Sequence, residues 1–209
     1  MNNRNYRKEM DNIISGFNNE VPTLLLHSCC APCSSACLEM LAPYFHVTVL
    51  YYNPNITSPD EYNKRLEEER RFIDKINDQA GFLTDKPFHP IKLIDGRYEP
   101  LEFFDIAKGL EDCPEGGERC FKCYELRLRE SAIVASNNNF DYFTTTLTIS
   151  PLKNATKLNE IGEKLATEYK VTYLPSDFKK KDGYKRSIAL SQEYDLYRQN
   201  FCGCVYSRR

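Results

Sequence analysis

The chain has 209 residues, a formal net charge of −2, and a composition that is 41% hydrophobic and 28% charged. These values are ordinary for a soluble globular protein, and the length is sufficient for a single domain with its own hydrophobic core. The near-neutral charge excludes a protein that coats nucleic acid with its whole surface, although it allows a local basic patch.

Short apolar runs alternate along the chain with longer amphipathic segments. In chain order, this pattern predicts a strand at 23–28, a helix at 32–44, a strand at 46–53, a helix at 58–80, a strand at 88–94, helices at 99–108 and 118–137, a strand at 140–147, a helix at 154–169, a strand at 171–175 and a helix at 184–200. The repeated β-α order predicts one α/β domain, residues 1–209, with a parallel sheet flanked by helices. Such sheets bind ligands at the carboxyl ends of their strands.

The sequence contains no apolar run of 18 residues, and its N-terminal segment lacks the apolar stretch of a secretory signal. We therefore expect no membrane partner and a cytoplasmic location. Nine cysteines in a reducing compartment favour metal binding or redox chemistry over structural disulfides, and an odd number of thiols cannot be fully paired.

Four of the nine cysteines lie in the segment HSCCAPCSSAC, directly after the first predicted strand. Cys29 and Cys30 stand where a nucleotide-binding fold carries a glycine-rich phosphate loop, and no glycine occurs between Phe17 and Gly81. The positive end of the following helix favours thiolates, which are the metal-binding form of cysteine. The segment therefore predicts a thiol site in place of a phosphate site.

A second pair, Cys120 and Cys123, has the spacing C-x-x-C at the start of a predicted helix, which puts both sulfurs on one side. With Cys29 and Cys30 they make four thiolates, which fit either a zinc ion or a 4Fe-4S cluster. We favour the cluster, because adjacent cysteines bind different irons of a cubane more easily than one tetrahedral ion. Cys33 lies on the same helix face as Cys30 and is a further candidate ligand.

The chain ends near a third thiol motif, FCGC, in which Gly203 relaxes the backbone. A disulfide between Cys202 and Cys204 would be strained and easily reduced, so the pair suits a redox relay, and two fortuitous thiols are the alternative. Cys37 is expected in the core. His27 either orients a ligand or is packed and hydrogen-bonded.

Four blocks occur in order from about Leu24 to Ser207, namely LLLHSCCAPCS, ERCFKCYELRL, TTTLTISPLKN and SDFKKKDGYKRSIALSQEYDLYRQNFCGCVYS. Together they resemble the epoxyqueuosine reductase family of the cobalamin-independent QueH type. The resemblance implies a Rossmann-like fold related to nucleotide-hydrolase domains and an enzyme that modifies tRNA. Members remove the epoxide oxygen of epoxyqueuosine at the anticodon wobble position, which gives queuosine.

The resemblance also implies cofactors, partners and site residues. The ligands of a 4Fe-4S cluster would be Cys29, Cys30, Cys120 and Cys123. Cys202 and Cys204 would form the redox-active pair. Some relatives carry an aspartate where this chain has Cys33, and that position can contact an additional mononuclear iron. Because this chain has a thiolate there, the resemblance leaves the presence and identity of a second metal open. The implied partners are tRNA carrying epoxyqueuosine and an electron donor that the sequence does not identify.

Substrate contacts are expected from a basic segment and from an aromatic side chain. The candidates are Lys153, Lys179, Lys180, Lys181, Tyr184, Lys185 and Arg186, with Arg208 and Arg209 at the chain end. The segment follows a predicted strand, where a crevice is expected, so its cations can contact phosphates and Tyr184 can stack on an unpaired base. A solvated charged face and core packing are the alternatives. Candidates for the proton donor are His27, Asp177 and Tyr184.

Three other functions remain open from the residues alone. A zinc-bound structural or RNA-binding module needs the four cluster thiols and leaves FCGC unused. A tRNA thiolation enzyme of the ATP-pyrophosphatase type requires an SGGxDS-like loop after the first strand, where this chain has HSCCAPCS. A plain thiol–disulfide oxidoreductase would retain its activity without Cys29 and Cys30.

Overall fold

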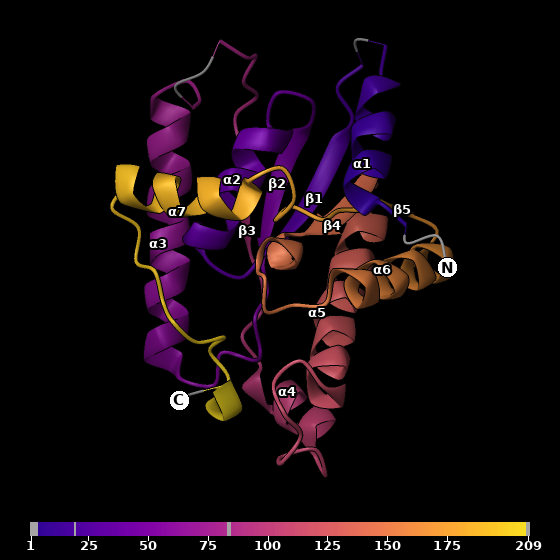
Figure 1. Ribbon diagram of the computed structural model, residues 1–209, viewed down its shortest axis with the longest axis vertical. Helices are drawn as coiled ribbons and strands as arrows, with labels where there is room; N and C mark the ends of the chain where they lie inside the picture. The colour runs from indigo at the N-terminus through magenta and orange to yellow at the C-terminus, as the bar shows by residue number, and fades with distance from the viewer. Residues whose placement is uncertain (1–3, 19, 83–84, 208–209) are drawn as a thin grey trace.

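The computed structural model describes residues 4–18, 20–82 and 85–207. In this part of the chain, five parallel strands form one sheet in the order β3-β2-β1-β4-β5 (Figure 1). The predicted α/β fold with a parallel sheet is confirmed. The order reverses between β1 and β4, which makes this the switch point of the sheet. The strands are β1 (Thr23–Ser28), β2 (His46–Tyr51), β3 (Lys92–Asp95), β4 (Tyr142–Thr145) and β5 (Thr172–Tyr173).

Seven α-helices and two 3-10 helices accompany the sheet within the described residues. They are α1 (Tyr6–Ser15), α2 (Ala31–Leu41), α3 (Pro59–Asp78), α4 (Pro100–Ala107), α5 (Glu118–Asn137), α6 (Ala155–Tyr169), α7 (Gly183–Glu193), η1 (Thr146–Ile149) and η2 (Val205–Ser207). Across those same described ranges, none of the helices is both long and apolar enough to cross a membrane.

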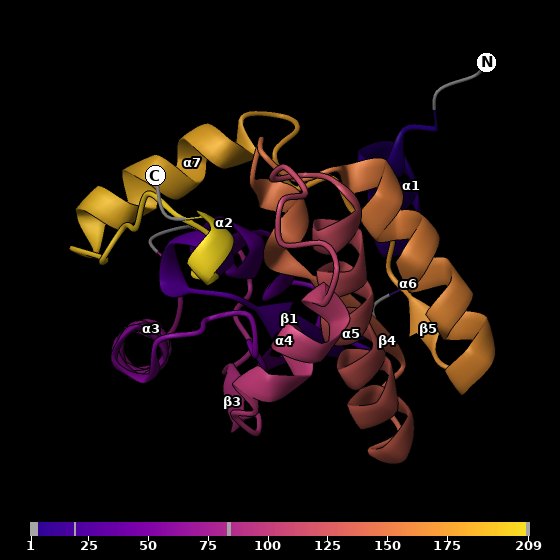
Figure 2. The ribbon, with the colours of Figure 1, turned by 90° about the horizontal axis from the view of Figure 1, so that it is seen from below.

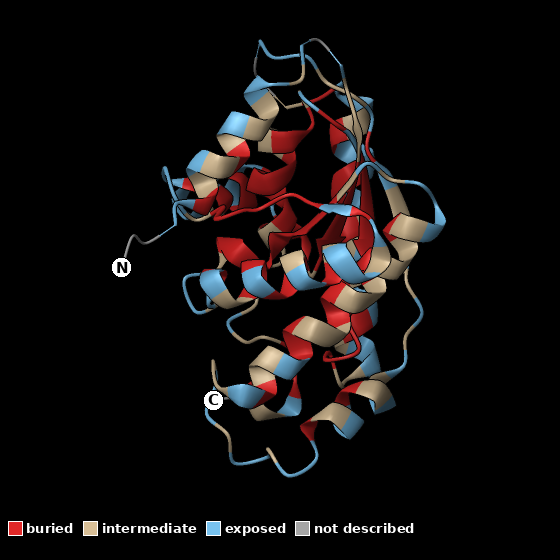
Figure 3. Ribbon diagram, turned by 90° about the vertical axis from the view of Figure 1, so that its right-hand side faces the viewer, coloured by how far each residue is buried: buried red, intermediate tan, exposed pale blue. Residues whose placement is uncertain are grey.

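Most of the helices form two layers with the sheet between them, whereas α4 packs against the start of α5 and the chain end (Figure 2). Side chains of α1, α2, α3 and α7 pack into one core, and those of α5 and α6 pack into the other. In β1, Leu24 and Leu26 belong to the first core and Leu25 to the second, because successive side chains of a strand point to opposite faces. Burial on both faces explains the continuous apolar run of β1, and Figure 3 shows the buried strands between the layers.

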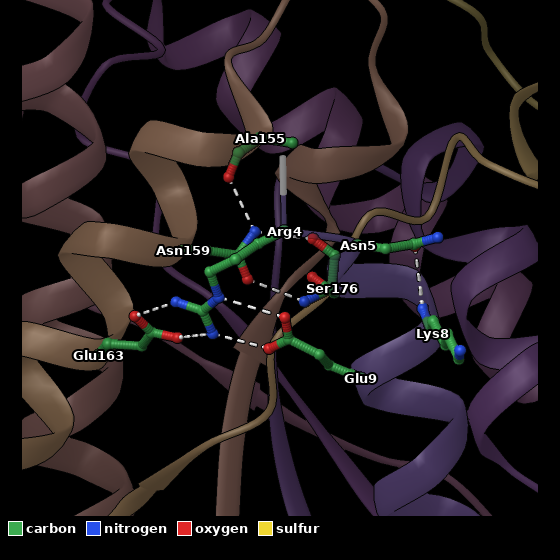
Figure 4. A network of polar contacts seen from close by, with 8 residues as sticks. All are labelled: Arg4, Asn5, Lys8, Glu9, Ala155, Asn159, Glu163 and Ser176. Atoms are coloured by element: carbon green, nitrogen blue, oxygen red, sulfur yellow. Dashed lines mark hydrogen bonds and ion pairs between the residues drawn. The ribbon is translucent and has the colours of Figure 1, made fainter. Parts of the chain in front are cut away.

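Helix α1 is absent from the elements that the sequence predicts. Asn5 caps its N-terminus, and Arg4 connects it to α6 through ion pairs with Glu9 at 2.6 Å and Glu163 at 2.8 Å (Figure 4). Met10 is fully buried in the first core. An isolated helix of ten residues is marginal in water, so these tertiary contacts account for its stability.

Several elements end at positions other than those predicted. The helix predicted at 184–200 ends at Glu193, because Asp195 has a positive φ of 49° that an α-helix cannot accommodate. The strand predicted at 140–147 ends at Thr145, where η1 begins. The second correction concerns the site, because it places η1 beside the first cysteine motif, with Thr146 Oγ1 3.9 Å from Cys29 Sγ.

The segment after α7 runs beside α3 (Figure 1). Side chains of α3 hold its backbone: Arg71 donates to the carbonyl of Asp195 at 3.0 Å, and Glu68 accepts from the N–H of Tyr197 at 2.6 Å. Closer to the chain end, Arg65 donates to the carbonyl of Cys202 at 3.1 Å. These bonds fix the position of the terminal cysteines.

Candidate active site

The first thiol group lies where β1 leads into α2. Cys29 follows β1, Cys30 is the N-cap of α2, and Cys33 lies in the first turn of that helix. The three Sγ atoms lie within 4.8 Å of one another, and those of Cys29 and Cys30 are 3.8 Å apart. A tetrahedral ion with metal–sulfur bonds of about 2.3 Å places its thiolates roughly 3.8 Å apart. The group therefore has a spacing at which sulfurs can share a metal.

Cys29 is the thiol of this group that ionises most readily. Hydrogen bonds from the thiols of Cys30 and Cys33 hold the pKa of Cys29 well below its ordinary value. The same contact with Cys29 is the main cause that raises the pKa of Cys30 and of Cys33, and burial raises both further. Two thiols thus stabilise a negative charge on the third, which suits a group that binds a cation.

A second thiol group faces a narrow cavity between α5 and the C-terminal segment. Cys120 and Cys123 come from the first turns of α5, and Cys202 and Cys204 come from the chain end. Burial raises the pKa of Cys120 and of Cys204, and it raises that of Cys123 to about 12. Gly116 donates its backbone N–H to Cys120 Sγ at 3.2 Å. The C-x-x-C pair and the terminal C-x-C pair thus line one cavity.

The two thiol groups border adjoining spaces at the carboxyl ends of the strands. A larger cavity of about 430 Å³ is lined by Cys29 and Cys33, and it shares Cys202 with the narrow cavity. Both cavities are also lined by two cations, the fully buried Arg127 and the half-buried Lys153. The arrangement lies beside the β1–β4 switch point, where parallel sheets bind ligands.

Arg127 of α5 is a buried cation between the thiol groups. Its side chain is 1% exposed, and its Nη2 donates to Asn53 Oδ1 at 2.7 Å. Burial lowers the pKa of Arg127, but Cys123 and Cys29 outweigh this and hold the pKa above its ordinary value. The guanidinium is therefore charged, and its field favours negative charge on the sulfurs around it.

His27 of β1 is neutral and fully buried. Burial, followed by the charge of Arg127, lowers the pKa of His27 to about 3. Its Nε2 lies 3.0 Å from the carbonyl of Tyr52, and its Nδ1 lies 2.9 Å from Thr145 Oγ1. Arg127 donates its Nε–H to the same Nε2 at 3.3 Å, so a backbone carbonyl and a buried guanidinium share this nitrogen. This geometry is that of a packed residue that ties neighbouring strands together.

Cys202 is the less buried member of the terminal pair, and polar side chains surround it. Lys153 Nζ lies 3.6 Å and Asn55 Nδ2 lies 3.8 Å from its sulfur. Asn55 is 2% exposed, and its Oδ1 has no hydrogen-bond partner among the described residues. Gly203 has a φ of +112°, and a Cβ there would lie 2.9 Å from Ile56, so the central glycine is required by its backbone and its packing.

The structure separates the predicted substrate residues. Lys153 and Tyr184 line the larger cavity, whereas Lys180 and Lys181 border a different cavity beside α1, and Lys185 is exposed on α7. Arg208 and Arg209 lie outside the described residues. Three cations are engaged in ion pairs, namely Lys179 with Asp177, Lys181 with Asp11 and Arg186 with Glu39.

Glu69 of α3 is a buried carboxyl group that the sequence reasoning missed. It is fully buried, and within the described ranges neither of its oxygens, nor Ser28 Oγ, has a hydrogen-bond partner. Burial is the main cause that raises the pKa of Glu69 to about 8, and the charge of Cys29 adds to it. Its position four residues after Arg65 and three before Phe72 places it on the buried stripe of α3, and this periodicity is the signal that could have found it.

We predict that Glu69→Gln stabilises the protein at neutral and alkaline pH. The ordinary pKa of 4.5 applies to the unfolded chain and about 8 to the folded one, so the folded state retains a proton that the unfolded chain releases. The stability of the native protein is therefore full below pH 4.5 and is lost as the pH rises through 8. Glutamine keeps the shape of the side chain and does not ionise. The free energy of unfolding of the variant is therefore expected to exceed that of the native protein by an amount on the order of a few kcal/mol at pH 8. Urea unfolding across this range measures it, and a pH-independent difference would contradict the prediction.

The fold and the site together define a thiol-rich α/β protein that is equipped for metal or redox chemistry at the switch point of a parallel sheet. A family model described as Epoxyqueuosine reductase QueH matches residues 24–209. The chain belongs to this family, as its four sequence blocks predicted.

Relatives that bear the same name match most of the chain. Epoxyqueuosine reductase QueH of Staphylococcus epidermidis is 42% identical over 207 residues, which cover 97% of this chain and 84% of that protein. The Streptococcus pyogenes serotype M1 protein is 40% identical over 207 residues, with coverages of 98% and 78%. The Thermotoga maritima protein is 33% identical over 191 residues, with coverages of 88% and 90%.

Proposed function

We propose that this protein removes the epoxide oxygen of epoxyqueuosine at the wobble position of a tRNA anticodon, giving queuosine, in the cytoplasm. Family membership supports the reductase activity. The observation that carries the proposal is the convergence of three distant cysteine segments at one edge of the sheet, around Arg127 and Lys153. Converting an epoxide to an alkene and water consumes two electrons and two protons, and thiols and iron–sulfur centres supply electrons in proteins.

We further propose that four thiolates hold a 4Fe-4S cluster and that Cys33 contacts an additional iron. The chemistry of the donor set fits such groups, because all of its ligands are sulfurs and a buried guanidinium offsets their negative charge. Two of the four cluster ligands belong to the group of three close sulfurs, and the other two line the adjoining narrow cavity. The proposed cluster ligands are Cys29, Cys30, Cys120 and Cys123. When bound, these metal groups supply single electrons and a Lewis acid for the epoxide oxygen.

Cys202 and Cys204 are the proposed redox-active pair, which passes electrons from an external donor. Oxidation of two thiols to one disulfide releases two electrons and two protons, and this matches the demand of the reaction. Asn55 and Lys153 contact Cys202 Sγ and orient it toward the cavity that Cys120 also lines.

Lys153 is the side chain that we propose to hold a proton beside the substrate. Its ammonium group lines both cavities, and the raised pKa of Lys153, which Cys202 maintains against the effect of burial, keeps it protonated. Other candidates are less suited: Asp177 borders the cavity beside α1, and His27 is fully buried and lines neither of the two cavities. Tyr184 lines the larger cavity and remains a candidate for base contact.

The proposal is tested by anaerobic incubation of iron-loaded protein with tRNA carrying epoxyqueuosine and a chemical reductant. Mass spectrometry of the nucleosides is expected to show the loss of one oxygen atom and the formation of queuosine. Absence of conversion by protein with its full iron content would refute the function. A colourless protein with stoichiometric zinc would instead support a structural module, and binding of ATP would support a thiolation enzyme.

Replacing Cys202 and Cys204 with serine is predicted to slow turnover that depends on a thiol or protein donor, because the dithiol relay is lost. Turnover with a strong chemical reductant is expected to continue, since that reductant bypasses the relay. Parallel assays with dithiothreitol and with dithionite measure the difference. Equal losses with both reductants would assign these cysteines a structural role.

A further inference from the structure

Positively charged side chains outnumber negatively charged ones in the lining of the larger cavity. Among the described residues that line it, four are cations, while Glu115 is acidic. One of the cations, Arg198, is exposed at the surface. The other three are less exposed and contact groups next to the cysteines: Arg65 the carbonyl of Cys202, Arg127 the amide oxygen of Asn53, and Lys153 the sulfur of Cys202.

Arg198 and Tyr184 lie together at this cavity. The guanidinium carbon of Arg198 is 5.4 Å from the centroid of the Tyr184 ring, and its Nη1 donates to Ser191 Oγ at 3.3 Å. Within the described chain, no carboxylate forms an ion pair with Arg198, and the Tyr184 side chain is 37% exposed. A Cβ at Gly183 would lie 1.8 Å from the carbonyl oxygen of Phe178, so close packing fixes the start of α7 that carries the ring.

From this arrangement we infer that Tyr184 and Arg198 form a clamp for one nucleotide of single-stranded RNA beside the reacting nucleoside. The exposed ring provides a stacking surface for an unpaired base, and the guanidinium, which has no carboxylate partner among the described residues, provides donors for a phosphate. The inference rests on the proposed function, because that RNA is the anticodon loop. The clamp includes Arg198, which lies outside the basic segment 179–186 that the sequence predicts to contact substrate. A free nucleoside has no phosphate, so the guanidinium contact favours RNA over a nucleoside.

RNA binding tests the clamp without turnover. Iron-loaded protein is titrated anaerobically into a fluorescent anticodon stem-loop that lacks the modified base, and anisotropy gives the Kd. Tyr184→Leu and Arg198→Gln are each expected to weaken binding roughly 5- to 100-fold, whereas Tyr184→Phe keeps the stacking surface and binds like the native protein. Arg70→Gln is the matched control, because Arg70 pairs with Asp95 at 2.8 Å away from the cavity, and it is expected to bind normally.

Salt dependence separates the two roles. Loss of one phosphate contact lowers the slope of log K against log salt by about 0.7 for a single strand, so Arg198→Gln should show this change and Tyr184→Leu should not. A Kd within twofold of the native value in Arg198→Gln, or an unchanged slope, would overturn the phosphate contact. Equally weak binding by Tyr184→Phe and Tyr184→Leu would overturn the stacking contact.

Steady-state kinetics distinguish this inference from the proposed function. On tRNA carrying epoxyqueuosine, both variants are expected to raise KM with little change in kcat, because the clamp binds a nucleotide that does not react. Protein that binds RNA through these residues but leaves epoxyqueuosine unchanged would refute the function and retain the clamp. If the protein is an active reductase and neither variant changes its affinity for RNA, the clamp alone is refuted.

Discussion

Replacing Cys29 with serine is expected to lower turnover of epoxyqueuosine tRNA by at least about 100-fold and to remove most of the bound iron. Cys29 is the thiolate that the thiols of Cys30 and Cys33 stabilise, so the substitution removes both the charged sulfur and the acceptor that holds the group together. Serine at position 30 is expected to have a comparable effect, because the Cys30 sulfur lies only 3.8 Å from that of Cys29. Iron and sulfide content, visible absorption and nucleoside mass spectrometry measure the outcome.

Cys37 offers the matched control on the same helix. It lies one turn beyond Cys33, is fully buried in the core with its sulfur 3.3 Å from the Cys33 carbonyl, and stands outside the group of three close sulfurs. Cys37→Ala is expected to retain iron and to turn over within about twofold of the native rate, since it leaves every proposed ligand in place. Full iron and full turnover in Cys29→Ser would show that the first thiol group does not bind the cluster.

Replacing Arg127 with methionine is expected to destabilise the protein by about 3–5 kcal/mol, the usual cost of breaking a buried charged contact. The substitution removes the cation that faces Cys123 and Cys29, and it leaves the Oδ1 of the fully buried Asn53 without the donor at 2.7 Å. Urea unfolding under anaerobic conditions measures the change in the free energy of unfolding, and iron analysis shows whether the thiol groups still bind metal.

Arg129 provides the control for this prediction, because it lies on the same helix and pairs at the surface with Glu125 at 2.8 Å. Arg129→Met is expected to lower the free energy of unfolding by less than about 1 kcal/mol, because exposed ion pairs contribute little to stability. If both variants lower the free energy of unfolding by the same small amount, the guanidinium of Arg127 is not an essential part of the buried network.

The sequence predicted the parts of this protein whose signals are local. Helix and strand periodicity identified the β-α order, and the apolar run Leu24–Leu26 identified a buried strand. Helix α1 was not predicted, because its stability depends on contacts of Arg4 and Met10 with distant segments of the chain. The end of α7 was also misplaced, since amphipathic periodicity continues past Glu193 although the backbone turns at Asp195.

By itself, the sequence determined which chemistry is available: the cysteine motifs, their spacing and the family to which they belong are all properties of neighbouring residues. The tertiary structure alone decided which of these groups meet. It brought the C-x-x-C pair of α5 to one cavity with the terminal cysteines, set Cys202 beside Lys153, and buried Arg127 and Glu69. The physical reason is that desolvation and charge–charge contacts arise between segments far apart in the chain, which no local pattern records.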